Sequence, residues 1–288
     1  MAEIVEFITP QKILLKGLTI GNSTAQTWYI IVHGLGGSML SLSSIAAQLA
    51  NQNSSVLVFN NRGHDLISRI KKIDKRKKSG YSSFYGGAAH EVFTDCADDI
   101  QGAVEFVKTK GAKKIILVGH STGSQKSIYY LSKSNSQDLI DHVILLSPLS
   151  DFAGILNRVG LEEYESILKI AKALVDQGSP HVLLPSTIWP EPIDAQRFLS
   201  LYTPVSEEDI FSYPTPDKPT ILSNIHTPLS VILGDSDEYA DRSIKEIKKW
   251  FDTHHSSKKY TSYIVKDGTH GFDGKEDTVV QYIKKWIQ

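Results

Sequence analysis

The stretch KKIILVGHSTGSQ (residues 113–125) decides how the chain is interpreted. It starts with a run of apolar residues and then places Ser121 between Gly119 and Gly123. A continuous apolar run is typical of a strand buried on both faces, and a helix-period pattern follows the serine. A serine flanked by glycines at such a turn is typical of a nucleophile elbow, where a sharp turn exposes the hydroxyl and larger neighbours would clash. The context therefore favours a reactive serine over a purely structural turn.

The same alternation of strand and helix patterns continues along the chain. The segment 4–21 predicts one or two additional strands, arranged as an antiparallel hairpin at an edge. Strands that alternate with helices predict an α/β fold with a mostly parallel central sheet and helices on both faces. The other apolar runs lie at 27–34, 54–60, 142–147 and 229–234, and the helix-period segments lie at 41–52, 95–111, 124–134, 243–254 and 276–288.

Two segments interrupt this rhythm. Residues 64–94 form a long connection that contains the basic run KKIDKRKK (71–78), which we interpret as a solvated loop. Residues 152–222 contain a helix-period segment followed by a proline-rich part. Because a structureless loop of this length is uncommon inside a compact domain, we expect a helical cap at 152–222, inserted into a core formed by 1–151 and 223–288.

Composition excludes several classes of protein. The 288 residues include 31 basic and 32 acidic ones, a balance that argues against a nucleic-acid binder. Cys96 is the only cysteine, so no intrachain disulfide forms. The first residues lack the apolar core of a signal peptide, and no apolar run is long enough to span a bilayer. We expect a cytoplasmic protein without a membrane span, and the sequence leaves its oligomeric state open.

A serine hydroxyl needs a base to take its proton, and a base needs an orienting acid. His270 lies on a glycine-flanked loop after the last predicted strand, where its side chain could reach Ser121. Asp235 and Asp237 both follow the strand at 229–234, and we favour Asp237 because the loop has room to turn toward the histidine there. The order serine, acid, histidine is the one expected for an elbow of this kind.

The first apolar strand ends in HGLGGS (33–38), which suits a site for a developing oxyanion. Such a site needs backbone N–H groups fixed in advance, and we expect them from Leu35 and Thr122. The glycine pattern lacks the third glycine of a dinucleotide fingerprint, no phosphate loop occurs, and HEVFT (90–94) lacks the second histidine of a zinc motif. We therefore expect no cofactor and no metal.

The motifs HGLGG, NNRGHD, GHSTGS, GDSDEY and GTHGF together resemble those of α/β-hydrolase serine esterases and lipases. They occur in that family's order and cover nearly the whole chain. The resemblance implies Ser121 as nucleophile, Asp237 as acid and His270 as base, with Asp151 as an alternative position for the acid. The combination NRGHD, GGAAHE, DCADDI and GHSTGSQ further resembles a branch that includes fungal siderophore-esterase-like proteins.

These observations predict a serine hydrolase that cleaves a carboxylic ester of a small or medium-sized substrate through an acyl-enzyme. Gly36, Tyr85 and Trp189 are candidates for the substrate pocket. The alternative is a ligand-binding receptor or sensor that keeps the hydrolase fold but turns over slowly. Within the enzyme class, a thioesterase, an amidase and a carbon–carbon hydrolase remain open, because fold and triad do not fix the bond that is cleaved.

Overall fold

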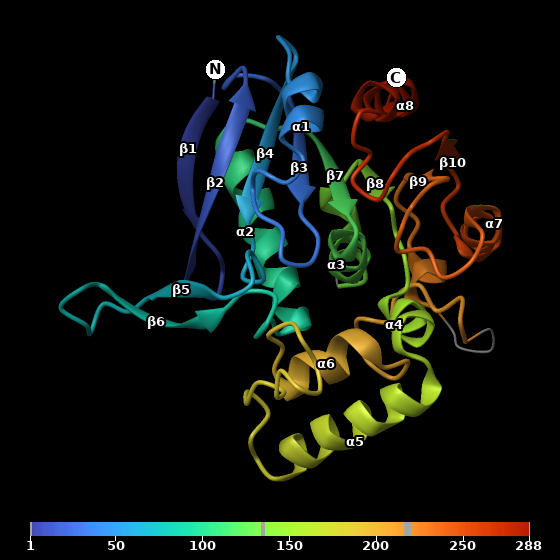
Figure 1. The fold of residues 1–288 in the computed structure, drawn as a ribbon. Helices are drawn as coiled ribbons and strands as arrows, with labels where there is room; N and C mark the ends of the chain where they lie inside the picture. The colour runs from blue at the N-terminus through green and yellow to red at the C-terminus, as the bar shows by residue number, and fades with distance from the viewer. Residues whose placement is uncertain (1, 134–135, 216–219, 288) are drawn as a thin grey trace.

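The structure is a computed structural model that describes residues 2–133, 136–215 and 220–287 (Figure 1). Its described strands form one sheet in the order β10-β9-β8-β7-β3-β4-β2-β5-β6, with β1 paired to β2. The strands are β1 (Ala2–Ile8), β2 (Ile13–Gly21), β3 (Thr27–Val32), β4 (Ser54–Asn60), β5 (Ser68–Ile73), β6 (Tyr81–Gly86), β7 (Lys114–His120), β8 (His142–Leu146), β9 (Leu229–Gly234) and β10 (Tyr260–Val265).

The central part of the sheet is parallel, which confirms the predicted α/β fold. Every neighbouring pair from β4 through β3, β7, β8 and β9 to β10 runs parallel. β8 is buried along its whole length, as expected for a strand covered on both faces. β1 and β2 form the antiparallel hairpin that segment 4–21 predicts.

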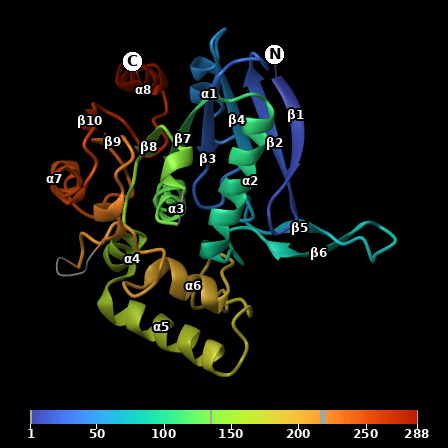
Figure 2. The same cartoon turned by 180° about the vertical axis from the view of Figure 1, so that it is seen from behind.

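Helices cover both faces of the sheet (Figures 1 and 2). On one face, α2 (Cys96–Thr109), α3 (Thr122–Leu131) and α7 (Ile244–His254) pack into one apolar core. On the other face, α1 (Ser43–Leu49) and α8 (Glu276–Ile287) build a second core. Short 3-10 turns lie at η1 (Phe93–Asp95), η2 (Gln137–Leu139) and η3 (Ile221–Asn224). None of the described helices is long and apolar enough to cross a bilayer.

A layer of three helices lies beyond one end of the sheet (Figures 1 and 2). It consists of α4 (Asp151–Val159), α5 (Leu161–Asp176) and α6 (Ala195–Tyr202). These helices share an apolar cluster that is separate from the two cores of the sheet and includes Tyr164, Trp189 and Phe198. This layer falls in the segment for which the sequence predicts a cap.

The connection at 64–94 differs from its sequence interpretation, because it contains a hairpin. β5 and β6 pair with each other in antiparallel register, and β5 joins the sheet through β2. The basic run extends from β5 over the turn, so it lies at the tip of a projecting hairpin rather than in an irregular loop (Figure 1). The strands SRIKKI and YSSFYG carry no continuous apolar run, which explains why the sequence pattern did not predict them.

Candidate active site

Ser121 lies in the turn between β7 and α3, as the sequence predicts. Its backbone has φ 55° and ψ −128°, a strained conformation for a non-glycine residue. A Cβ atom on Gly119 would lie 2.3 Å from the carbonyl oxygen of Gly123, and one on Gly123 would lie 2.1 Å from that of Val32. Glycine is therefore required at both positions, because any side chain would collide with main-chain atoms.

His270 and Asp237 are hydrogen-bonded to each other. The Nδ1 atom of His270 lies 2.8 Å from Oδ2 and 3.0 Å from Oδ1 of Asp237. The Asp237 side chain is fully buried, and its Oδ1 also accepts a hydrogen bond from the backbone N–H of Tyr239 at 3.0 Å. A carboxylate at Nδ1 favours the tautomer that leaves Nε2 as a free acceptor.

Ser121 and His270 line the same cavity. No hydrogen bond connects the Ser121 hydroxyl to the His270 ring within the described part of the chain. Catalytic hydrogen bonds are often long in ligand-free structures and tighten when substrate binds. The arrangement therefore brings the three predicted triad residues together, with one link, Asp237 to His270, already formed.

The competing carboxylates have other partners. Asp235 Oδ1 accepts a hydrogen bond from the backbone N–H of Asp267 at 2.6 Å, so it joins two loops. Asp151 Oδ2 accepts from the side-chain amide of Gln125 at 2.6 Å. Of the three aspartates that the sequence left open, the structure places only Asp237 against His270.

The half-buried His120 lies beside His270, and its ring supports the loop that carries His270. Its Nε2 lies 2.9 Å from the backbone carbonyl oxygen of His270, which also accepts a hydrogen bond from the Ser147 hydroxyl at 2.9 Å. Burial, with a smaller contribution from His270, lowers the pKa of His120 to about 4. His120 is therefore neutral at physiological pH and can donate its Nε2 proton to this carbonyl.

The backbone N–H groups of Leu35 and Thr122 donate no hydrogen bond within the described residues, and both residues line the cavity with Ser121. The glycine before Leu35 sits tightly against the elbow, since a Cβ on Gly34 would lie 2.7 Å from Cβ of Ser121. His33 fixes this turn from behind: its Nδ1 bonds the Gly34 carbonyl at 2.8 Å while its Nε2 accepts from Asn61 N–H. Burial lowers the pKa of His33 to about 3 and keeps it neutral.

The cavity has a volume of about 770 Å³ and lies between the end of the sheet and the helical layer. Gly36 and Trp189 line it, as the sequence predicts for the substrate pocket. Tyr85 does not: it lies on the projecting β6 strand and is 72% exposed. This prediction was wrong, because the aromatic residues of 81–85 belong to a hairpin that leads away from the core.

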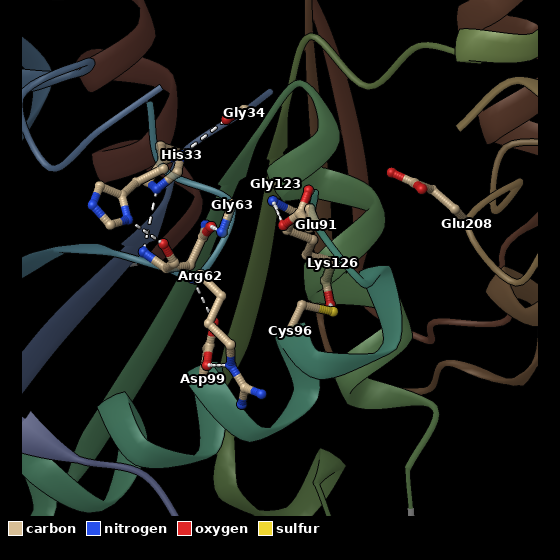
Figure 3. Close-up of polar contacts among 12 residues, drawn as sticks. His33, Gly34, Arg62, Gly63, Glu91, Cys96, Asp99, Gly123, Lys126 and Glu208 are labelled. Atoms are coloured by element: carbon tan, nitrogen blue, oxygen red, sulfur yellow. Dashed lines mark hydrogen bonds and ion pairs between the residues drawn. The ribbon is translucent and has the colours of Figure 1, made fainter. Parts of the chain in front are cut away.

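A group of buried charges surrounds Glu91, which is only 4% exposed. Figure 3 shows it with Lys126 of α3, whose Nζ lies 2.6 Å from Oε1. Arg197 of α6 donates to the other Glu91 oxygen at 3.0 Å and also pairs with Glu208. No sequence pattern predicts that Lys126, Arg197 and Glu208 meet, because these residues are far apart along the chain.

A second buried ion cluster braces the turn after β4. Arg62 is 5% exposed and bonds Asp99 at 2.7 Å, Asp95 at 2.9 Å and also Asp98 (Figure 3 shows the contact with Asp99). No group of three or more His, Cys, Asp or Glu among the described residues is arranged to hold a metal ion.

Comparison with known proteins places the chain in a family. Residues 66–288 match the model of a family described as "Protein of unknown function (DUF1749)". The chain belongs to the DUF1749 family. A UPF0613 protein of Schizosaccharomyces pombe is 27% identical over 249 residues, which are 79% of this chain and 73% of that protein. Fusarinine C esterase sidJ of Aspergillus fumigatus is 32% identical over 148 residues, 38% of this chain and 42% of that protein.

Solved structures similar to this DUF1749 protein share its fold. The siderophore hydrolase EstB from Aspergillus fumigatus aligns with a TM-score of 0.63 at 19% identity, covering 94% of this chain and 95% of EstB. The α/β hydrolase GrgF from Penicillium aligns with a TM-score of 0.64 at 16% identity, covering 99% and 97%. Est1E from Butyrivibrio proteoclasticus, solved with ferulic acid, aligns with a TM-score of 0.63 at 16% identity and 98% coverage of both chains. At these identities the likeness shows the α/β-hydrolase fold.

Proposed function

We propose that this DUF1749 protein is a serine hydrolase that cleaves carboxylic esters of small or medium-sized substrates through an acyl-enzyme. The observation that carries the proposal is the hydrogen-bonded Asp237–His270 pair, which faces the same cavity as Ser121 on its strained elbow. The names of the similar proteins, which include esterases and hydrolases, support the same reaction class.

In the proposed reaction, His270 Nε2 takes the Ser121 proton as the hydroxyl oxygen attacks the ester carbonyl. Asp237 holds the ring in the required tautomer and stabilises the imidazolium that forms. His270 then protonates the leaving alcohol, the carbon–oxygen bond breaks, and an acyl group remains on Ser121. Water, activated by His270, attacks the acyl-enzyme and releases the acid.

We propose that the N–H groups of Leu35 and Thr122 bind the oxyanion of both tetrahedral intermediates. The two amides have no acceptor among the described residues, so they need not break a bond to receive the developing charge. Donors fixed in advance stabilise the transition state without reorganisation, and the loss of one such donor typically costs about 100- to 1,000-fold in kcat.

We also propose that residues 152–222 act as a cap over a core of 1–151 and 223–288. The cavity is lined from the core by Ser121 and His270 and from the helical layer by Ile155 and Trp189. A substrate bound to Ser121 would therefore be enclosed partly by the sheet and partly by the cap. Exclusion of water by such a cover strengthens the electrostatic interactions inside.

The test uses p-nitrophenyl acetate and butyrate with the full chain. Wild type should hydrolyse at least one of them, and Ser121→Ala should lose at least about 10³-fold in kcat, as expected for removal of a nucleophile that acts with a base. A fluorophosphonate should label Ser121 of the wild type and leave the variant unlabelled. The control is Ser79→Ala in the exposed β5–β6 turn, which should keep wild-type activity.

Two outcomes would contradict the proposal. Equal rates for wild type and Ser121→Ala would show that another group performs the chemistry. A folded wild type that neither hydrolyses the esters nor reacts with the fluorophosphonate, but shows a ligand-induced rise in melting temperature, would favour the receptor alternative.

A further inference from the structure

The wall of the cavity carries two hydrogen-bond acceptors that the proposed reaction does not use. Gln125 lies on α3, one turn after Ser121, and Asp151 is the first residue of α4; both line the cavity. The Gln125 side-chain amide donates to Asp151 Oδ2 at 2.6 Å and to the Leu149 carbonyl at 3.3 Å. Both N–H groups of the Gln125 side chain are thus occupied. These two hydrogen bonds fix the orientation of the amide and leave Oε1 available to accept from a ligand.

Gln125 Oε1 has no hydrogen-bond partner among the residues that the structure describes, although the residue is only 2% exposed. Leaving a buried acceptor without a donor costs free energy, so such an atom calls for an explanation. Asp151 Oδ1 likewise accepts no hydrogen bond from any described residue. Gln125 Oε1 and Asp151 Oδ1 therefore belong to side chains that are hydrogen-bonded to each other, at the wall of the cavity that Ser121 also lines.

Asp151 also lacks a cationic partner within 2–133, 136–215 and 220–287. Arg197, whose positive charge acts on Asp151, already pairs with Glu91 and Glu208. Burial and the negative charge of Glu208 raise the pKa of Asp151 to about 7. A positive charge brought by a ligand would stabilise the ionised form of this half-buried carboxyl group, so Asp151 is a suitable place for such a charge.

The charges around the cavity favour the same kind of ligand. Besides Asp151, the formally charged side chains that line it are Arg158, Glu191 and Glu238. Arg158 and Glu191 form an ion pair at 2.8 Å and cancel each other. The remaining carboxylates, Asp151 and Glu238, leave the cavity with an excess of negative charge, which attracts cations.

We propose that Asp151 and Gln125 form a binding site for a protonated amine carried by the ester substrate. A protonated amine with one N–H donates it to Asp151 Oδ1, and an amine with two or more N–H groups also donates to Gln125 Oε1, while the ester carbonyl lies at Ser121. The inference rests on the proposed function, and it names the substrate class as esters that bear a cationic amine within the same small molecule.

The test compares esters with matched carbon isosteres. On the alcohol side, 3-(dimethylamino)propyl butyrate is compared with 4-methylpentyl butyrate; on the acyl side, ethyl 4-(dimethylamino)butanoate is compared with ethyl 5-methylhexanoate. A hydrogen bond to a charged group favours the amine in at least one pair by about 10- to 100-fold in kcat/KM. Asp151→Asn should reduce that preference to within about threefold, because the neutral amide no longer attracts the cation. The control is Glu163→Gln on the exposed side of α5, which should retain the preference.

A second measurement does not depend on a variant folding. For wild type hydrolysing p-nitrophenyl butyrate, 3-(dimethylamino)propan-1-ol and 4-(dimethylamino)butanoate should inhibit, at least one of them with a Ki about tenfold below that of its carbon isostere. Equal Ki values and equal kcat/KM within both pairs would overturn the inference, as would an amine preference that Asp151→Asn retains. In that case the carbon isosteres would still be hydrolysed, so the proposed function would stand without the amine site. Failure of the proposed function looks different, because then no ester is cleaved and Ser121 takes no label.

Discussion

His270 is held in one orientation by contacts on every side. Asp237 accepts from its Nδ1 at 2.8 Å, Glu238 accepts from its backbone N–H at 2.9 Å, and the Tyr239 ring packs against the imidazole in a T-shaped arrangement with 4.8 Å between the ring centroids. A base that is fixed before substrate arrives needs no ordering in the transition state. The three residues 237–239 therefore position His270, the proposed base, although only the first of them takes part in the proposed chemistry.

The first prediction concerns the choice between the two neighbouring aspartates. Asp237→Asn should lower kcat by about 10³- to 10⁴-fold, because the amide donates to His270 Nδ1 and forces the proton onto Nε2, where an acceptor is needed. The matched control is Asp235→Asn, whose side-chain oxygen can still accept from Asp267 N–H, and which should stay within about threefold of wild type. Rates for p-nitrophenyl butyrate and melting temperatures of both variants give the measurement. If Asp235→Asn is the inactive variant, Asp237 is not the acid.

At this scale the sequence predicts the serine and the histidine better than the acid. Ser121 and His270 lie in short motifs whose glycines reveal the local backbone. The acid depends on how the loop after β9 turns, and Asp235, Asp237 and Asp151 all follow buried strands. Gln125 was missed for a different reason. Its two amide N–H groups bond Leu149 and Asp151, which lie in the connection between β8 and α4, and local sequence does not encode such a contact.

At the scale of elements, the turn between β7 and α3 depends on the close approach of β3. The carbonyl oxygens of Val32 and His33 lie where a Cβ on Gly123 would be, at 2.1 and 2.8 Å. The end of β3 and the start of α3 can approach this closely only because residue 123 has no side chain. The same contact brings Gly34 and Leu35 beside Ser121, so the packing of two elements aligns the proposed oxyanion donors with the proposed nucleophile.

The second prediction follows from this contact. Gly123→Ala should lower the free energy of unfolding by about 3 kcal/mol or more, because main-chain atoms rather than a flexible side chain must move. Gly154→Ala in α4 is the matched control: nothing lies within 4 Å of its Cβ position, and alanine should stabilise the helix by up to about 1 kcal/mol. Urea unfolding followed by tryptophan fluorescence measures both. Equal stabilities for the two variants would mean that β3 and α3 do not press on each other as described.

The elements that the sequence predicts well are those with the strongest apolar patterns. Strands β3, β4, β7, β8 and β9 start and end within two residues of the predicted runs, because burial on both faces leaves a continuous apolar signal. The β5–β6 hairpin was missed since its strands are mostly polar. Such a hairpin is defined by pairing with β2, a long-range contact that local sequence does not encode.

At the scale of the whole molecule, the helical layer and the sheet meet at a buried set of charges. Glu91 follows the hairpin and Lys126 lies on α3, whereas Arg197 and Glu208 belong to 152–222. His90 of the same connection also bonds the buried Asp194 at 2.9 Å. Each part of the chain contributes one cation and one anion to the first group, and the ion pair between Arg197 and Glu91 connects the two parts. This arrangement couples the layer's position, and with it one wall of the cavity, to the core.

The last prediction tests that coupling. Arg197 is fully buried and bonds both Glu91 and Glu208, so Arg197→Met leaves two buried carboxylates with one cation fewer. Removal of one member of a buried ionic group typically costs about 3–5 kcal/mol. Arg158→Met serves as the control, because this arginine is half-exposed and pairs with Glu191 at the surface, where such a pair is worth up to about 1 kcal/mol. Urea unfolding gives the stabilities, and limited proteolysis within 152–222 reports whether the layer has loosened. If Arg197→Met is no less stable and no more readily cleaved than Arg158→Met, the buried charges do not hold the two parts together.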